Sequence, residues 1–158
     1  MTPSPSLRTA QWLAAIVPAL LLGGAYVSQY VFGLYPCEMC LWQRWPHLAA
    51  LAFALLSFVL RPTRLFLALA AGGILVSGLI GGFHAGVEYG WWEGITSCSV
   101  AAVAAPGQSA LDAIMNAPLV RCDTAAWTLF GISLAGYNFL ISTASAFAIF
   151  WLMKDRPS

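Results

Sequence analysis

Four cysteines are the residues of this chain whose type and spacing best suit chemistry. Cys37 and Cys40 form a C-x-x-C pair in YPCEMCLWQR, directly before a long apolar run, whereas Cys98 and Cys122 are far apart in a later segment. The stability that a disulfide adds grows with loop length, so a C-x-x-C pair braces a fold poorly. It is better suited to thiol–disulfide exchange. Cys98 and Cys122 enclose a longer loop, and this spacing is as compatible with a structural disulfide as with an exchange-active one.

A zinc site is the main alternative for these cysteines. Structural zinc sites usually contain two C-x-x-C-like pairs, or cysteines and histidines at matching spacing. Here the second two cysteines are widely separated, and neither His47 nor His84 has the spacing of a zinc knuckle. The spacing therefore favours exchange over metal binding, and we assign no metal ligand.

Two pairs of residues, Cys40 with Arg44 and His84 with Glu88, have the four-residue spacing of neighbours on one helix face. Arg44 follows Cys40 by four residues, so the two side chains share one face if this segment is a helix. The helix dipole also favours an anion near the first turn, and both effects favour a Cys40 thiolate, the attacking species in exchange. The alternative is that Arg44 only extends to lipid head groups. His84 and Glu88 are also four residues apart, which is compatible with a local pair.

The composition places these residues in a membrane protein. Of the 158 residues, 60% are hydrophobic and 8% are charged, whereas about 25% are charged in soluble domains. The net charge of +1 gives no indication of nucleic-acid binding. Electrons that reach Cys37 and Cys40 therefore need an acceptor in or near the lipid, and a membrane quinone is the natural candidate.

Four apolar segments are candidates for membrane-spanning helices, each of which needs about 20 residues. We predict a single all-α membrane domain, a four-transmembrane-helix bundle. Its spans are predicted at about 11–32, 41–60, 65–87 and 125–153, with an outer loop at about 88–124. The alternative for the second span is a short re-entrant helix, and for the first span it is a cleavable signal peptide.

The basic residues predict the orientation of this bundle. Lys and Arg of short loops and tails are enriched on the cytoplasmic side. With four crossings, one side carries Arg8, Arg61, Arg64, Lys154 and Arg156. Both termini are therefore predicted to be cytoplasmic, and all four cysteines to face outward, on a short first and a long second outer loop. Residues 109–116 of the long loop have apolar side chains on one helical face, which predicts a short amphipathic helix.

Several stretches together resemble one known family. They are PCEMCLWQR, GGFHAGVEYGWWEG, the TSC that ends at Cys98, and APLVRCD followed by AAWTLFGISLAGYN. These motifs are similar to the disulfide bond formation protein B (DsbB) family and cover most of the chain from Cys37 to Asn138. The resemblance implies a bacterial inner-membrane protein with its cysteines facing the periplasm. It implies that the chain reoxidises a periplasmic, DsbA-like thioredoxin-fold oxidase and passes the electrons to a quinone, either ubiquinone or menaquinone.

The resemblance also implies roles for the four cysteines. Cys98 would receive the attack of the partner's thiolate, and Cys122 would be its disulfide mate. The reduction would then be relayed to Cys37, the exchange-facing member of the C-x-x-C pair, and to Cys40 beside the quinone ring.

Two further residues follow from the same resemblance. Arg44 would support the charge at the quinone, and His84 would hydrogen-bond a quinone oxygen. The alternative for His84 is an interfacial histidine satisfied by water or backbone. Two alternative functions stay open: a vitamin K epoxide reductase-like quinone reductase, and a non-enzymatic membrane scaffold with structural disulfides.

Overall fold

The computed structural model describes residues 4–96, 109, 111 and 120–154. Within them lie four long helices, α1 (Pro5–Tyr30), α2 (Glu38–Val59), α3 (Thr63–Glu88) and α5 (Leu134–Lys154). A small hairpin of β1 (Thr128–Leu129) and β2 (Ile132–Ser133) precedes α5. The predicted helical architecture is confirmed for this part of the chain. Cys98 and most of the predicted amphipathic helix at 109–116 lie outside the described residues.

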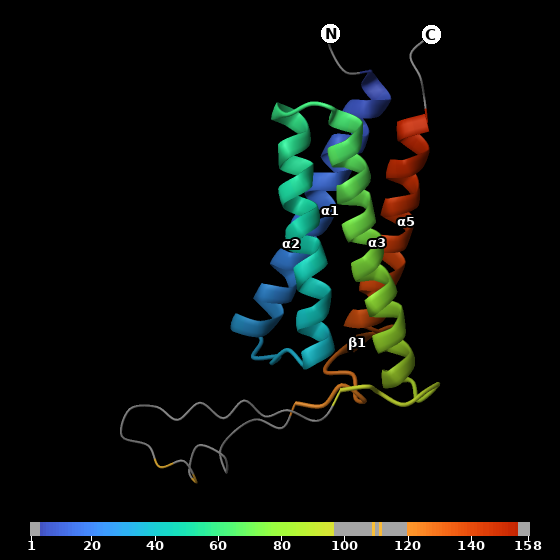
Figure 1. Cartoon of the computed structure of the whole chain (residues 1–158). Coiled ribbons are helices and arrows are strands. Elements are labelled where there is room, and N and C mark those ends of the chain that lie inside the picture. Colours follow the sequence, from blue (N-terminus) through green and yellow to red (C-terminus); the bar gives the residue numbers. More distant parts are fainter. Residues whose placement is uncertain (1–3, 97–108, 110, 112–119, 155–158) are drawn as a thin grey trace.

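The four helices form an antiparallel bundle (Figure 1). Helix α2 packs along α3, α3 packs along α5, and α1 contacts both α2 and α5. The start of α1 and the end of α5 lie at the same end of the bundle as the α2–α3 connection. The start of α2, and with it the C-x-x-C pair, lies at the opposite end. The C-x-x-C pair therefore lies at the end of the bundle opposite the α2–α3 connection.

Local sequence explains where α1 and α2 begin. The Ser4 hydroxyl accepts a hydrogen bond from the Leu7 amide, and Pro5 occupies the first turn of α1, where its missing N–H costs nothing. At α2 the capping position is taken by Cys37, whose sulfur accepts the Cys40 amide. The cap of α2 is thus itself one of the two cysteines of the C-x-x-C pair.

Small side chains allow the helices to approach closely. One buried cluster consists largely of alanines from all four helices, filled in by Leu67, Ile74 and Ile149. At Gly73, an added Cβ would lie 2.9 Å from the Pro46 carbonyl oxygen, so the backbones of α2 and α3 are nearly in contact. Interfaces built from small residues are typical of helices packed within a bilayer.

Large apolar side chains cover the outside of the bundle. Helices α1, α3 and α5 are each long and apolar enough to cross a membrane, which identifies a membrane protein. Helix α2 does not reach the same hydropathy, because its first half contains Gln43, Arg44 and His47. That α2 is a fourth crossing stays a prediction, as do the sides on which the termini and loops lie.

The start of the last helix differs from the sequence estimate. A span beginning at about 125 was predicted, but α5 begins at Leu134, and β1 and β2 occupy the residues before it. The turn between the strands is formed by Phe130 and Gly131, whose φ angles are 51° and 77°. Two successive positive φ values suit a tight two-residue hairpin turn, and they interrupt a helix.

Candidate active site

The two cysteines of the C-x-x-C pair face each other across the first turn of α2. The Cys37 thiol donates a hydrogen bond to the Cys40 sulfur, 2.9 Å away, and the Cys40 amide donates to the Cys37 sulfur at 3.3 Å. Cys37 is buried and Cys40 is half-buried, and both are free thiols in this structure. The hydrogen bond to Cys40, followed by burial, raises the pKa of Cys37 to about 12. In the reduced pair, Cys37 therefore holds its proton and Cys40 is the acceptor.

Cys122 reaches the same place from the chain segment before the hairpin. It packs, with Cys40, against the small buried cluster of Cys37, Met39 and Val87. Burial raises the pKa of the Cys122 thiol. The donor atoms of Cys37, Cys122 and His84 all lie within 4.8 Å of one another. These three groups could hold a soft cation such as zinc, an arrangement that their sequence spacing did not indicate because they come from three separate segments.

His84 and Glu88 form the pair expected from their spacing on α3. Their side chains are 2% and 6% exposed, and His84 Nε2 lies 3.6 Å from Glu88 Oε1. The same nitrogen lies 3.5 Å from the Cys37 sulfur. His84 Nδ1 is 2.9 Å from the side-chain amide nitrogen of Gln43. The imidazole is thus fixed between the C-x-x-C pair and a buried polar side chain of α2.

Arg44 is anchored to α1. Its guanidinium donates to Gln29 Oε1 at 2.6 Å and to the Ala25 carbonyl at 3.4 Å, and it lies over the Tyr26 ring, 5.0 Å from the centroid. These contacts retain the charge inside the bundle, whereas the head-group alternative would direct it outward. Helical spacing placed Arg44 on the face of Cys40. In the structure both residues line one cavity, but the contacts of the guanidinium are with α1.

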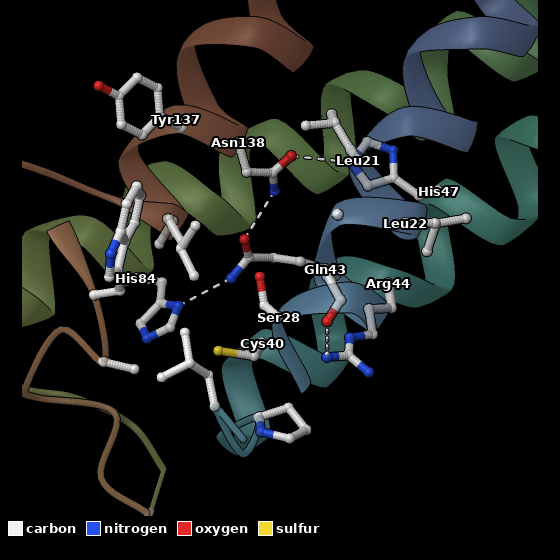
Figure 2. A pocket seen from close by; sticks show the side chains of 18 of the residues that line it. Leu21, Leu22, Ser28, Cys40, Gln43, Arg44, His47, His84, Tyr137 and Asn138 are labelled. Carbon is white, nitrogen blue, oxygen red and sulfur yellow. Dashed lines mark hydrogen bonds between the residues drawn. The ribbon is translucent and has the colours of Figure 1, made fainter. Parts of the chain in front are cut away.

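The cavity lies between α1, α2, α3 and the start of α5 and has a volume of about 250 Å³. Figure 2 shows Cys40, Gln43, Arg44, His47 and His84 around it. Most of the remaining wall is apolar, with Leu20, Leu21 and Leu22 among its residues. This volume is slightly below the roughly 300 to 1,000 Å³ of pockets for drug-sized ligands, and it suits a single ring better than a whole molecule of that size.

Three buried polar atoms of residues in the cavity wall have no hydrogen-bond partner among the described residues: Arg44 Nε, His47 Nδ1 and Glu88 Oε2. Buried polar atoms are normally paired, so unpaired atoms at a cavity point to a ligand or to water. A quinone fits this donor set. Its ring is planar and apolar, its oxygens accept hydrogen bonds, and Arg44 Nε is a buried donor without an acceptor.

The comparisons with known proteins decide the family. The family model described as "Disulfide bond formation protein DsbB" matches residues 7–152. The chain belongs to the DsbB family.

Individual relatives agree with this assignment. The chain is 30% identical to disulfide bond formation protein B of Azoarcus sp. (strain BH72), over 99% of this chain and 98% of that protein. It is 27% identical to disulfide bond formation protein B 2 of Pseudomonas savastanoi pv. phaseolicola, over 85% and 81% of the two chains. An uncharacterized protein of Rickettsia prowazekii is 27% identical over 80% and 76%. No solved structure matches. Membership of the DsbB family identifies a membrane oxidoreductase that acts on disulfides.

The structure brings together the described residues that the DsbB resemblance singled out. Cys37, Cys40 and Cys122 gather at one end of the bundle. Cys40, Arg44 and His84 line the cavity beside them. Cys98 lies outside the described residues, so its relation to Cys122 stays a prediction.

A polar network behind these residues was not predicted. The Asn138 amide nitrogen donates to Gln43 Oε1 at 2.8 Å, and Asn138 Oδ1 accepts from His47 Nε2 at 2.9 Å and from the Ser142 hydroxyl at 2.8 Å. Gln43, His47 and Asn138 are all buried. The sequence did contain a signal for this network, namely polar residues within otherwise apolar helices. Burying a polar side chain in a membrane helix costs free energy unless it is paired, so such residues usually pair or have a function.

Proposed function

We propose that this protein reoxidises a periplasmic, DsbA-like dithiol oxidase by thiol–disulfide exchange and passes the electrons to a membrane quinone. The observation that carries the proposal is the position of three sulfurs. Cys122 approaches Cys37, Cys37 contacts Cys40, and Cys40 lies in the wall of the cavity. This series leads from the outer loop to a buried, largely apolar site.

The first exchange takes place in the outer loop. The partner's thiolate attacks Cys98 of a Cys98–Cys122 disulfide, which forms a mixed disulfide and releases Cys122 as a thiolate. The partner's second thiolate then attacks its own half of the mixed disulfide and releases Cys98. The partner leaves with a disulfide, and the loop pair carries the two electrons. The DsbB resemblance supports these roles for Cys98 and Cys122.

The second exchange moves the two electrons to the C-x-x-C pair. The Cys122 thiolate attacks Cys37 of the Cys37–Cys40 disulfide, and Cys40 leaves as a thiolate. Cys98 then attacks Cys122, re-forming the loop disulfide and releasing Cys37, which takes up a proton. The raised pKa of Cys37 favours this protonation. The resulting hydrogen bond from Cys37 to Cys40 leaves the negative charge on the sulfur in the cavity wall.

A quinone bound in the cavity would accept the two electrons and allow the C-x-x-C disulfide to re-form. Cys40 and Arg44 are the residues that would hold it, and His84 lies in the same wall with its ring nitrogens already in contact with Gln43 and Cys37. Arg44 contributes a positive charge and its unpaired Nε–H. The apolar leucines of α1 would exclude water from its ring.

We further propose that the chain lies in the bacterial inner membrane, with its cysteines facing the periplasm. The basic residues support this orientation. Arg8 in the first turns of α1, Arg61 in the α2–α3 connection and Lys154 at the end of α5 belong to the end of the bundle away from the start of α2 (Figure 1). Residues on that end would be retained on the cytoplasmic side.

The test is a spectrophotometric assay of the purified protein in detergent. A soluble quinone and a reduced thioredoxin-fold dithiol oxidase are added, and loss of quinone is followed against loss of partner thiols. The proposal expects one quinone consumed for each partner dithiol oxidised, and no consumption by Cys40→Ser. If partner thiols are oxidised without loss of quinone, the quinone assignment is wrong. If Cys40→Ser turns over normally, the relay is wrong.

The same variant tests the scaffold alternative. A structural C-x-x-C disulfide predicts that Cys40→Ser lowers the melting temperature. The exchange mechanism predicts that this variant retains its melting temperature and loses only turnover.

A further inference from the structure

Gln43 has an amide orientation that is fixed by its surroundings. Its Nε2 lies 3.1 Å from the Met39 carbonyl oxygen, and its Oε1 lies 2.8 Å from Asn138 Nδ2. A backbone carbonyl can only accept a hydrogen bond, so the atom of Gln43 that faces Met39 must be the NH2 group.

The amide orientation of Asn138, the neighbour of Gln43, is fixed in the same way. Asn138 Nδ2 donates to the Ser77 carbonyl oxygen at 3.1 Å as well as to Gln43 Oε1. Since the Ser77 carbonyl also can only accept, Asn138 cannot be flipped without losing both bonds. Two backbone carbonyls on different helices therefore determine the donor and acceptor pattern of this buried pair.

The glycine at position 81 makes room for this pair. A Cβ added there would lie 3.0 Å from Asn138 Nδ2 and 3.2 Å from Gln43 Oε1. The bond between α2 and α5 thus passes directly against the backbone of α3. The close fit leaves the two amides little freedom to exchange partners.

The orientation of Gln43 determines where His84 carries its proton. Of the two amide hydrogens of Gln43, one is directed to Met39, and the other is directed to His84 Nδ1 at 2.9 Å, as Figure 2 shows. His84 Nδ1 must then be the acceptor. In a neutral imidazole the other nitrogen carries the hydrogen, so His84 is the Nε2–H tautomer.

The hydrogen on Nε2 is aimed at the exchange centre. Nε2 lies 3.5 Å from the Cys37 sulfur and 3.6 Å from Glu88 Oε1. Both are acceptors when Cys37 is a thiolate and Glu88 is ionised. A nitrogen that already carries a hydrogen cannot take the proton of the Cys37 thiol, but it can donate to the sulfur once that proton has left.

We propose that Gln43 is a positioning residue, which fixes the neutral His84 as the Nε2–H tautomer and so makes it a hydrogen-bond donor to the Cys37 sulfur. The meaning of this arrangement for exchange depends on the proposed function. The tautomer itself does not, and it is measured without turnover.

The experiment compares two matched substitutions of buried glutamines. In Gln43→Glu, a carboxylate oxygen replaces the NH2 group and accepts a hydrogen bond from His84 Nδ1, which moves the ring proton to Nδ1. The control is Gln11→Glu. Gln11 is also buried and also donates to a backbone carbonyl, that of Ser57 at 2.8 Å, but it lies in α1, near the other end of the bundle.

Long-range ¹H–¹⁵N spectra of the reduced protein, labelled with ¹⁵N-histidine in detergent micelles, distinguish the two ring nitrogens; His84→Asn assigns the signals. We expect the proton on Nε2 in the wild type and in Gln11→Glu, and on Nδ1 in Gln43→Glu. A wild-type proton on Nδ1 would overturn the inference. So would an unchanged tautomer in a folded Gln43→Glu.

A second variant covers the case in which Gln43→Glu does not fold. Gln43→Leu removes the donor without burying a charge, and the wild-type preference for Nε2–H is expected to be lost, with both tautomers populated. Retention of the Nε2–H form in Gln43→Leu would show that Gln43 does not position the ring. Failure of the quinone assay with an intact tautomer pattern would refute the proposed function and leave this inference standing.

Discussion

The Cys37 thiol donates its hydrogen bond to the Cys40 sulfur and retains its own proton, with a pKa raised to about 12 from an ordinary value of 9.0. Because the folded-state pKa lies above the ordinary one, this interaction stabilises the reduced protein below about pH 9. The stabilisation is lost as the pH rises towards 12. We expect the melting temperature of the reduced protein to fall more between pH 8 and 11 than that of the oxidised protein. The oxidised form is the control, because it has neither the Cys37 thiol nor the Cys122 thiol, whose pKa is also raised, to titrate. Equal slopes for the two forms would contradict the assignment.

Cys37 and Cys122 should form a disulfide when Cys40 is absent. Their sulfurs lie within 4.8 Å of each other, so little movement is needed to join them. In the double variant Cys40→Ser, Cys98→Ser, which also removes the loop partner of Cys122, mild oxidation is expected to give a Cys37–Cys122 disulfide, detected by mass spectrometry of unreduced peptides. Cys37→Ser is the matched variant and should not give a link through position 37. A protein lacking both Cys40 and Cys98 in which Cys37 stays free under the same oxidant would show that the relay contact is not formed.

Substitution of Arg44 should weaken quinone binding more than it affects exchange with the partner protein. Loss of a hydrogen bond from a charged donor costs about 1.5 to 3 kcal/mol, so Arg44→Ala is expected to raise the apparent Michaelis constant for quinone on the order of tenfold or more. Mixed-disulfide formation with the partner should be unchanged. Arg61→Ala, at the opposite end of the bundle, is the control for loss of a positive charge. An unchanged quinone dependence in Arg44→Ala would reduce Arg44 to a membrane anchor.

Glu88 should accept the proton of the Cys37 thiol, which an Nε2–H form of His84 cannot take. Its carboxylate is buried, one oxygen faces His84 Nε2, and the other has no partner among the described residues. Loss of a general base typically costs about 10² to 10⁴ in rate, so Glu88→Gln should lower kcat at saturating quinone by at least about 10². Glu38→Gln is the matched control, since Glu38 lies between the two cysteines in sequence and is assigned no chemical step. Equal kcat values for the two variants would argue against a proton at Glu88.

Gly81 should be intolerant of a side chain, whereas Gly72 should accept one. A Cβ at Gly81 would lie 2.9 Å from the Ala135 carbonyl oxygen, but at Gly72 it would meet nothing within 4 Å. Overpacking a core typically costs about 1 to 3 kcal/mol, whereas replacing glycine with alanine inside a helix gains roughly 0.5 to 1 kcal/mol. Thermal denaturation in detergent should therefore show a lower melting temperature for Gly81→Ala and an equal or higher one for Gly72→Ala. A higher melting temperature for Gly81→Ala than for Gly72→Ala would contradict the close contact between α3 and α5.

Local patterns predicted much of the architecture and part of the site. The apolar segments indicated all four helices, and the four-residue spacing of His84 and Glu88 was compatible with the pair that they form. The end of the outer loop was harder to predict. Residues 125–133 are mostly apolar or aromatic and resemble the start of a helix, whereas the positive φ angles of Phe130 and Gly131 close a hairpin there. Gly131 suits a positive φ, but a bulky residue such as Phe130 rarely adopts one, so residue type alone did not predict this turn.

The polar network could not have been predicted from spacing. Gln43 and Asn138 are 95 residues apart, and Gln43 and His84 are 41 apart. Such contacts depend on how three helices are rotated against one another, which helical periodicity does not determine for nearly uniform apolar segments. Arg44 shows the same limit. Its spacing from Cys40 was informative about the shared face, but its partners on α1 come from the packing of the bundle.

The wall that α1 contributes to the cavity has a consequence for any measurement of affinity. Leu20, Leu21 and Leu22 belong both to this wall and to a helix apolar enough to lie in lipid. An apolar ligand therefore partitions into the surrounding lipid or micelle before it binds, and the concentration that matters is the one in that phase. Doubling the detergent at constant total ligand increases the micelle volume and so dilutes the ligand within the micelles. The apparent Michaelis constant, expressed per volume of solution, should then rise in proportion to the micelle volume, although no contact in the cavity has changed.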